Sequence, residues 1–331
     1  MQDVVLRYWG IDELRDCGMR CIFCAVIFTL MSSAFAASGW AGAWCMKKGA
    51  LYSKLSHNRY FTVYTFDEHG DKERNSYGST FRDNNITWYN EYGLLDNVTI
   101  FASIPYKWLT SHYRYIEKEK LKHSRHTYQG LGDVDLGLKY CFLENPLVLS
   151  LQLLTKTAWF YDSDENVPPG NNQNDYELKL LAGKSLWPFP AYCGIELGYR
   201  WRTSSPSDEY RYLLEFGMNL PKKFSWRVKL DGIKSVKNAD LPEPKPVVST
   251  YIDEETGQLI KTVYRPSKST STFSNPSLGL EYDLGKVEFT LGYQQNKHWS
   301  LECTYTNYPY GENIATGDQY SFAIVYYFSK D

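Results

Sequence analysis

The run His123-Ser124-Arg125-His126 contains the residue types best suited to chemistry. A hydrolase would need the serine and a histidine held by a third group on rigid strands, whereas this run lies in a segment rich in lysine. A metal site would need an aspartate or cysteine at a ligand spacing, and none follows the histidine pair. The favoured interpretation is therefore a solvated basic loop. Catalysis by the serine and metal binding by the histidines are the alternatives.

A second set of candidates consists of charged residues at the polar positions of alternating segments. They are Asp133, Asp135, Lys139, Glu177, Lys179, Glu196, Arg200, Arg202, Arg211, Glu215, Arg227, Lys229, Asp231, Glu281 and Asp283. Pairs of carboxylates among them suit general acid-base chemistry. Lysines and arginines nearly balance the carboxylates, however, and unpaired charges are costly in a low-dielectric shell. We therefore expect ion pairs between neighbouring strands, and no enzyme activity, metal or cofactor.

The segments that position these charges alternate between apolar and polar residues. In residues 134–142 every second residue is apolar, and the pattern recurs at 195–202, 212–219, 224–231 and 278–283. A period of two is typical of strands and puts the two sets of side chains on opposite faces. The residues expected on the apolar face include Leu136, Leu138, Leu197, Leu214 and Leu280.

The composition excludes several classes of protein. Of 331 residues, 36 are Lys or Arg and 38 are Asp or Glu, so the net charge of −2 does not favour nucleic acid as a partner. A mean hydropathy of −0.46 with 16% aromatic residues suits strands better than helices. Beyond the first few dozen positions no apolar run reaches about 18 residues, which excludes a helical membrane protein.

Alternation alone does not distinguish a membrane barrel from a secreted β-sandwich, which is the alternative fold. The strands run for about ten residues or more, the length that an outer-membrane strand needs. Tyrosine and tryptophan stand at the ends of the apolar sets, for example Tyr199, Trp201, Trp226 and Tyr293, as in the aromatic girdles of membrane barrels. With the export signal described next, these features predict an all-β, transmembrane, antiparallel up-and-down β-barrel.

Residues 1–36 are predicted to be a signal peptide. Arg20 precedes an apolar stretch from Cys21 to Met31 and a small-residue cleavage site that ends at Ala36, and Met19 is an alternative start. A short buried core helix is the alternative interpretation. Residues 37–50 are predicted to form a periplasmic segment and residues 51–331 the barrel. The four cysteines after the cleavage site are far apart and indicate no disulfide framework.

Short turns alternate with longer polar segments, which predicts short periplasmic turns, long external loops, an even strand number and both termini in the periplasm. Thirteen strands can be read, at 51–66, 84–94, 97–109, 130–143, 146–158, 174–186, 191–203, 208–220, 223–235, 270–284, 286–296, 299–309 and 318–328. Alternation continues from Val287 to Cys303, and Lys297-His298 lacks turn chemistry, so we merge 286–309 into one strand. The prediction is a barrel of twelve strands with an external loop at 310–317.

Three segments resemble the outer-membrane family named for meta-pathway phenol degradation. They are residues 91–99 leading to Ile104-Pro105-Tyr106, residues 130–140, and the closing strand with Tyr320, Phe322, Ile324, Tyr326 and Phe328. The start, Gly42-Ala43-Trp44, is also similar. The resemblance implies an exported barrel of the bacterial outer membrane and passage of aromatic or apolar compounds. The closing strand also resembles the signal for the barrel assembly machinery, although Ser329-Lys330-Asp331 follow it.

The predicted function is a passive channel or uptake pore for small solutes, aromatic ones included, with selectivity set by the inward charges. The alternative is a non-transport barrel that stabilises the envelope or binds partners through its long loops, and a lipid-modifying enzyme is the least supported. The expected partners are outer-membrane lipids and lipopolysaccharide, the barrel assembly machinery and a small aromatic solute. The basic loop at 115–128 is expected to lie against the anionic sugar-phosphate layer.

Three arginines of adjacent strands, Arg200, Arg202 and Arg211, are expected to form a basic cluster near the outer rim. Such a cluster would attract anionic solutes to the mouth of a channel. The structural alternative pairs them with Glu196 and Glu215, in which case they stabilise the wall.

Overall fold

The structure is a computed structural model that describes residues 42–117, 120–162, 165–240, 247–252, 259–264 and 280–329. The predicted signal peptide, residues 1–36, lies outside the described residues. In the described part of the chain, no helix is long and apolar enough to cross a membrane.

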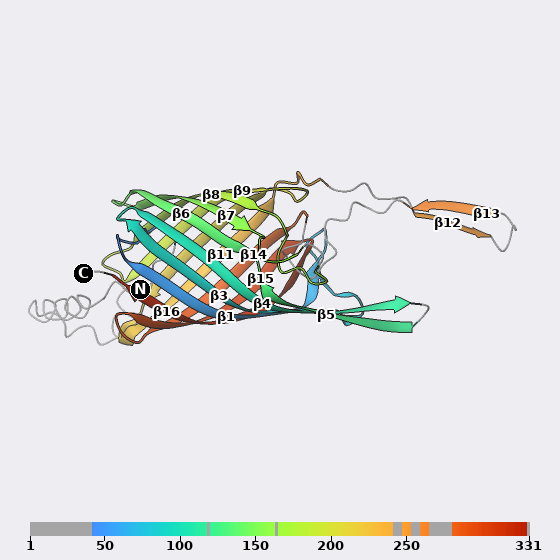
Figure 1. Ribbon diagram of the computed structural model, residues 1–331, viewed down its shortest axis with the longest axis horizontal. Helices are drawn as coiled ribbons and strands as arrows, with labels where there is room; N and C mark the ends of the chain where they lie inside the picture. Colours follow the sequence, from blue (N-terminus) through green and yellow to red (C-terminus); the bar gives the residue numbers. More distant parts are fainter. Residues whose placement is uncertain are drawn as a thin grey trace, which may run out of the picture.

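Twelve antiparallel strands form a closed barrel (Figure 1). They are β1 (Leu51–Phe66), β3 (Thr80–Leu95), β4 (Val98–Glu117), β6 (Val134–Leu143), β7 (Val148–Thr157), β8 (Asp175–Ser185), β9 (Ala191–Arg202), β10 (Glu209–Asn219), β11 (Phe224–Ser235), β14 (Asp283–Gln294), β15 (Trp299–Glu312) and β16 (Ile314–Phe328). The wall closes because β16 pairs with β1, from Leu51 opposite Phe328 to Phe66 opposite Ile314. The predicted fold class and strand number are confirmed.

Further strands lie outside this wall. β5 (Lys120–Leu131) pairs with the far half of β4 and forms a hairpin that projects beyond the rim (Figure 1). β2 (Lys72–Arg74) pairs with the end of β1, and β12 (Val247–Ile252) pairs with β13 (Leu259–Tyr264) in a separate hairpin. Two short 3-10 turns, η3 (Ser76–Gly78) and η4 (Pro221–Lys223), stand in connections.

The predicted strand at 286–309 is wrong. β14 and β15 are separate strands joined by a tight turn at 295–298. In that turn the Asn296 side-chain oxygen accepts hydrogen bonds from the backbone N–H groups of His298, at 2.9 Å, and Trp299, at 3.0 Å. An asparagine side chain thus stabilises the turn where glycine or proline was expected.

The predicted strand at 270–284 explains why the total was nevertheless right. Residues 280–282 are not in a strand, residues 270–279 lie outside the described residues, and β14 begins at Asp283. β11 pairs directly with β14, so no strand from 270–284 stands between them in the wall. One merged pair of strands and one strand too many in the wall therefore cancelled in the prediction.

The predicted external loop at 310–317 is also wrong. Residues 310–312 pair back onto β14, and β16 begins at Ile314, so only Asn313 connects the two strands. Its φ of 53° lies in the left-handed region, which asparagine tolerates better than most residues.

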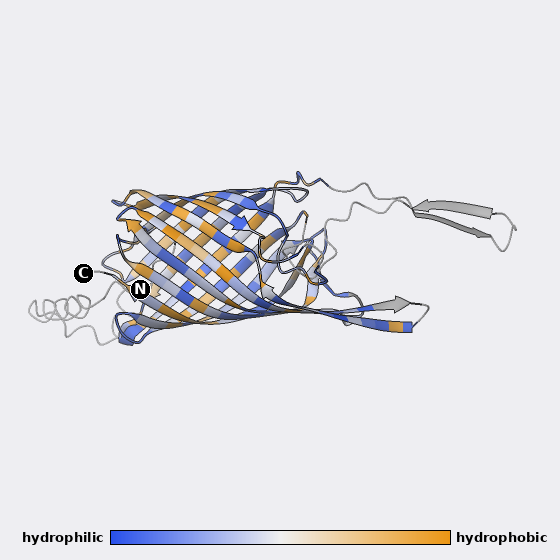
Figure 2. Ribbon diagram, viewed as in Figure 1, coloured by the Kyte–Doolittle hydropathy of each residue, from blue (hydrophilic) through white to orange (hydrophobic). Residues whose placement is uncertain are grey.

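Apolar and polar residues alternate along the strands of the wall (Figure 2). Leu136, Leu138, Leu197 and Leu214 are between 38% and 55% exposed on the outer face, as predicted. Leu280 precedes β14 and does not belong to a strand. The barrel therefore presents an apolar exterior, as expected of a surface in contact with lipid.

The two ends of the barrel differ in their connections. At the end where Leu51 meets Phe328, the strands are joined by short turns such as 96–97 and 144–147. The opposite end has the longer connections, including residues 158–174 and the β4–β5 hairpin. This is the alternation of short and long connections expected from the sequence.

Candidate functional site

The inner face of the wall is lined by charged side chains that pair across strands. Glu177 on β8 is the register partner of Arg200 on β9, and the guanidinium Nη2 lies 2.6 Å from its carboxylate. Glu209 on β10 contacts Arg211 at 3.0 Å and Arg202 at 3.4 Å. None of these five side chains is more than 15% exposed. Each charge is therefore compensated mainly by its partner rather than by water.

A second group surrounds Glu302 on β15. Its Oε2 lies 2.6 Å from the Nζ of Lys54 on β1 and 3.3 Å from the Nη2 of Arg227 on β11. β14 separates β11 from β15 in the wall, so Arg227 reaches past a strand along the inner face. Ion pairs thus connect strands that do not share hydrogen bonds.

Most of the other predicted inward charges also have partners. They are Glu215 with Lys229 (3.2 Å), Asp231 with Lys286 (2.6 Å), Lys179 with Glu177 (3.1 Å) and Glu196 (3.3 Å), Lys139 with Glu91 (3.4 Å), and Asp133 with Lys156 (3.2 Å). Pairing is therefore the general state of the described interior, which is what a near-balance of charges predicts.

Two candidates differ from this pattern, Asp135 and Glu281, and a third, Asp283, is paired at the end of the barrel. One carboxylate oxygen of Asp135 is buried and has no hydrogen-bond partner among the described residues. Glu281 precedes β14 and accepts the N–H of Ala239 at 3.2 Å, so its expected place on a strand is wrong. Asp283, the first residue of β14, is buried, forms an ion pair with Lys234 and accepts the N–H of Ser235 at 2.8 Å. Both of the latter lie at the end of the barrel with the long connections.

The three arginines expected near the outer rim are all paired. The carboxylates involved are Glu177 for Arg200, Asp175 and Glu209 for Arg202, and Glu209 for Arg211. Glu196 and Glu215, the partners expected from the sequence, contact lysines instead. Asp175 and Glu209 lie within the predicted strands at 174–186 and 208–220, one inward step before Glu177 and Arg211, but were not included among the candidates. Extending the polar positions of β8 and β10 by one step would have included both.

The segment before β1 folds into the barrel at the end with the short turns. The carbonyl of Gly42 accepts a hydrogen bond from Lys139 Nζ at 2.9 Å, and the carbonyl of Ala43 accepts one from the Ser150 hydroxyl. Further along, Met46 N–H donates to Thr99 Oγ1 at 2.7 Å. Residues 42–46 thus contact the inner faces of β4, β6 and β7. No local sequence pattern indicates this placement.

Two glycines make room for that segment. A Cβ atom at Gly183 would lie 2.7 Å from the Trp44 ring, and one at Gly93 would lie 2.0 Å from the carbonyl oxygen of Lys47. Trp44 also packs edge-on against Tyr192, with ring centroids 5.7 Å apart. Any larger residue at either glycine would displace the segment.

The opposite end of the interior contains part of the connection between β7 and β8. Lys107 Nζ donates to the carbonyl of Pro169 at 2.6 Å, and Asp133 accepts a hydrogen bond from the Tyr161 hydroxyl. Burial, together with the nearby Asp133 charge, raises the pKa of Tyr161. Val167 of the same connection packs in a buried cluster with Tyr60, Phe81, Leu109 and Tyr128. Segments that are not wall strands therefore narrow both ends of the interior: residues 42–46 at one end and the connection between β7 and β8 at the other.

The prediction that the basic run at 123–126 lies in a loop is wrong, because the run is part of strand β5 on the projecting hairpin. Ser124 Oγ is 2.6 Å from His126 Nε2, but His123 and His126 point to opposite faces of β5 because they are three residues apart on a strand. His123 instead lies beside His112 of β4, with ring centroids 5.8 Å apart. Within the described ranges, no three His, Cys, Asp or Glu side chains are arranged to hold a metal.

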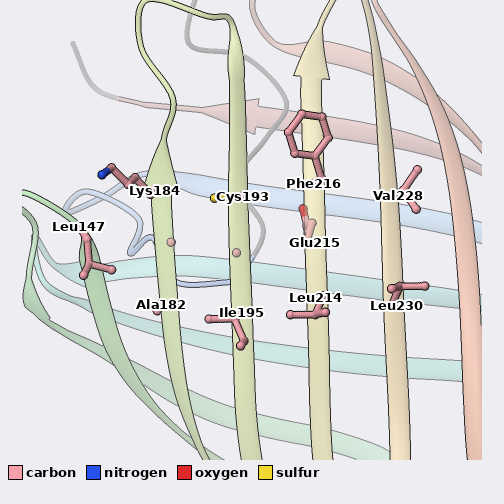
Figure 3. A pocket seen from close by; sticks show the side chains of 12 residues that line it. Leu147, Ala182, Lys184, Cys193, Ile195, Leu214, Glu215, Phe216, Val228 and Leu230 are labelled. Carbon is pink, nitrogen blue, oxygen red and sulfur yellow. The ribbon is translucent and has the colours of Figure 1, made fainter.

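The outer face also has an apolar groove of about 450 Å³ across β8 to β11 (Figure 3). Ile195, Leu214 and Leu230 are among its lining residues, and Gly183 and Gly194, register partners on β8 and β9, contribute only backbone to it. The groove faces the medium outside the barrel. It therefore belongs to the apolar exterior rather than to the charged interior.

The barrel is similar to the crystal structure of an outer-membrane channel from Pseudomonas putida F1, with a TM-score of 0.60 and 13% identity over 89% of this chain and 100% of that one. The chain has the fold of an outer-membrane channel. Weaker similarities include the NanC porin (TM-score 0.46, 10% identity, 84% and 100% covered) and a TodX monoaromatic hydrocarbon channel variant (0.41, 10%, 85% and 91%). No family model and no curated protein matches the chain, so membership of the phenol-degradation family is not confirmed.

Proposed function

We propose that this protein is a passive channel of the bacterial outer membrane that admits small solutes. The observation that most supports this function is the closed wall, apolar outside and charged inside, in a fold shared with an outer-membrane channel. An apolar exterior requires a lipid environment, and a polar interior suits a path for water and solutes. The resemblance of residues 91–99 and 130–140 to the phenol-degradation family makes small aromatic compounds the first solutes to test.

The proposal includes a location and an orientation. The apolar exterior and the signal peptide expected at residues 1–36 favour the outer membrane, reached through the barrel assembly machinery that the aromatic closing strand would engage. The end with Leu51 and Phe328 would face the periplasm, because its turns are the short ones. Outer-membrane lipids, lipopolysaccharide among them, would then surround the wall.

A second function, an envelope-stabilising barrel without transport, is favoured by one observation. The segment before β1 enters one end of the interior and the connection between β7 and β8 enters the other. The inward charges between these two ends are mostly paired. A barrel stabilised in this way would resist deformation whether or not it conducts.

Conductance in planar bilayers tests the two functions against each other. We expect discrete ion currents from the purified protein, and smaller currents when a small aromatic carboxylate is added to one side. A control with a twelve-stranded barrel of known conductance shows that the bilayer setup detects channels of this size. Absence of any current from correctly folded protein would favour the structural function instead.

A further inference from the structure

The outer face of β4 changes character along its length. From the short-turn end, the outward residues are Ile100, Ala102, Ile104, Tyr106, Trp108, Thr110, His112 and Arg114. Apolar side chains give way to two aromatic rings, Tyr106 and Trp108, with centroids 4.9 Å apart, and then to basic groups. In a membrane barrel the aromatic rings mark the interface, so the basic groups lie on the polar side of it.

Neighbouring strands add basic side chains to the same outer face. Arg59 of β1 is in register with Asn84, which is in register with Trp108, so this arginine stands in the row of the aromatic rings. Arg82 of β3 pairs with Thr110 one step further from the membrane, and its guanidinium lies 5.2 Å from the ring centroid of Phe61.

β5 completes the set. Arg125 is the register partner of His112, and His123 is the register partner of Arg114, so these four side chains share one face of the hairpin. We call Arg59, Arg82, His112, Arg114, His123 and Arg125 the outer basic patch. Four of its six members are guanidiniums, which bind phosphate through two parallel hydrogen bonds.

The outer basic patch has little acidic compensation in the described structure. None of its members forms an ion pair with a described carboxylate, in contrast to the interior, where nearly every charge does. Asp318 of β16, the register partner of Phe61, accepts a hydrogen bond from the Tyr305 hydroxyl at 2.8 Å. Arg59, Arg82, His123 and Arg125 are exposed.

The height of the outer basic patch indicates what it meets. A strand advances about 3.3 Å per residue, so the patch extends from the level of Trp108 to about 20 Å further along the strand. The headgroup region of a bilayer begins directly outside the hydrocarbon core. In the outer leaflet proposed above, the groups at this height carry negative phosphates.

We propose that the outer basic patch is a binding site for the phosphates of the outer-leaflet glycolipid, with the guanidiniums as the main donors. The site rests on the proposed outer-membrane orientation and not on conduction. It would hold a lipid against β1, β3 and the β4–β5 hairpin and so fix the projecting hairpin relative to the membrane surface. The opposite face of the hairpin, with Lys120 and Lys122, is basic as well but does not continue the lipid-facing surface.

The experiment compares lipid A carrying both phosphates with the same lipid lacking them, each added to purified, detergent-solubilised protein and measured by native mass spectrometry. We expect the wild type to retain phosphorylated lipid A, and R114Q/R125Q to retain it about tenfold less tightly or weaker still. The matched variant K120Q/K122Q removes two charges from the other face and should retain the lipid like the wild type. Millimolar inorganic phosphate should not displace the bound lipid, since the acyl chains remain against the wall.

Four outcomes would each overturn the site. They are equal retention of the lipid by all three proteins, equal loss of retention in both variants, equal binding of the lipid without phosphates, and release of the lipid by inorganic phosphate. Slower migration after boiling, measured on each preparation, shows that the barrels are folded. Conductance measured on the same samples separates this site from the channel. Currents without specific lipid retention would refute the site alone, and retention without currents would refute the channel alone.

Discussion

Arg200 on β9 contacts the carboxylate of its register partner Glu177 on β8 through two guanidinium nitrogens, Nε at 2.7 Å and Nη2 at 2.6 Å. Both nitrogens contact the same carboxylate oxygen, Oε2, while the other oxygen, Oε1, lies 3.1 Å from Lys179 Nζ. Hydrogen bonds between two ionised groups are stronger than those between neutral groups. The Glu177 side chain is only 1% exposed, so water cannot replace the arginine. Variants of this pair can therefore test whether the charges of the interior mainly stabilise the barrel or line a path for ions.

Removing the arginine alone should destabilise the barrel. Arg200→Gln leaves a buried carboxylate with Lys179 as its remaining partner, and we expect the free energy of unfolding to fall by about 3 kcal/mol. Urea unfolding of the protein in lipid vesicles measures the change. The double variant E177Q/R200Q should recover most of the loss, while R59Q, an exposed arginine, should cost less than about 0.5 kcal/mol. If the free energy of unfolding of the double variant fell as much as that of R200Q, the unpaired carboxylate of Glu177 would not be the cause of the loss.

The same pair gives a prediction about selectivity. If solutes pass through the interior, removing positive charge there should favour cations, so R200Q should shift the reversal potential in a salt gradient toward the potassium value. E177Q should shift it toward the chloride value, and E177Q/R200Q should remain close to the wild type. Identical reversal potentials for all four proteins would place the current path away from this pair.

The sequence predicts the wall well because alternation is a local property. The apolar positions of residues 134–142 alone decide which face of β6 meets lipid, and Leu136 and Leu138 lie where the period of two puts them. The turn at Asn296 was missed because a side-chain amide replaces the glycine expected in a tight turn. In both cases the information lies within a few residues.

The candidate site was less predictable because its partners are distant in the sequence. The carbonyl of Ala43 meets the hydroxyl of Ser150, 107 residues away, and Lys54 meets Glu302, 248 residues away. No local pattern predicts which inward charges will meet across a barrel, or that a segment preceding the first strand will enter it. The near-balance of positive and negative charges predicts that ion pairs form. Which residues form them depends on the strand register of the closed barrel.

Trp44 provides a test of the segment inside the barrel. Its ring fills space that Gly183 leaves free and packs edge-on against Tyr192. Trp44→Ala should therefore widen the interior at the short-turn end, and the single-channel conductance should rise. Trp159→Ala is the matched control, because that side chain is 69% exposed and follows β7 at the opposite end of the barrel. Equal conductance in both variants and the wild type would show that the segment does not limit the current.

The outward leucines test the membrane assignment. Leu197 is 55% exposed on the outer face of β9. Leu197→Arg should lower the free energy of unfolding in vesicles by about 2–4 kcal/mol if the residue lies near the bilayer midplane. Leu197→Met should change it little, since methionine keeps the apolar contact with lipid. A negligible effect of the arginine would mean that this surface meets water, as in a secreted sandwich.

The connection between β11 and β14 tests the orientation of the chain. Residues 238–268 include Pro242, Pro244 and Pro246 and the hairpin of β12 with β13. β11 ends and β14 begins at the same end of the barrel as the β4–β5 hairpin, opposite the end where Leu51 meets Phe328.

If the end with Leu51 and Phe328 faces the periplasm, a protease added to intact cells should cut within the connection between β11 and β14. The two fragments should remain associated until they are boiled, because β11 and β14 are paired along ten residues. A protease site inserted in the short turn at 144–147 should stay protected in the same cells and become accessible only after the outer membrane is opened. Cleavage in the reverse order would invert the orientation, and with it the proposed position of the outer basic patch in the outer leaflet.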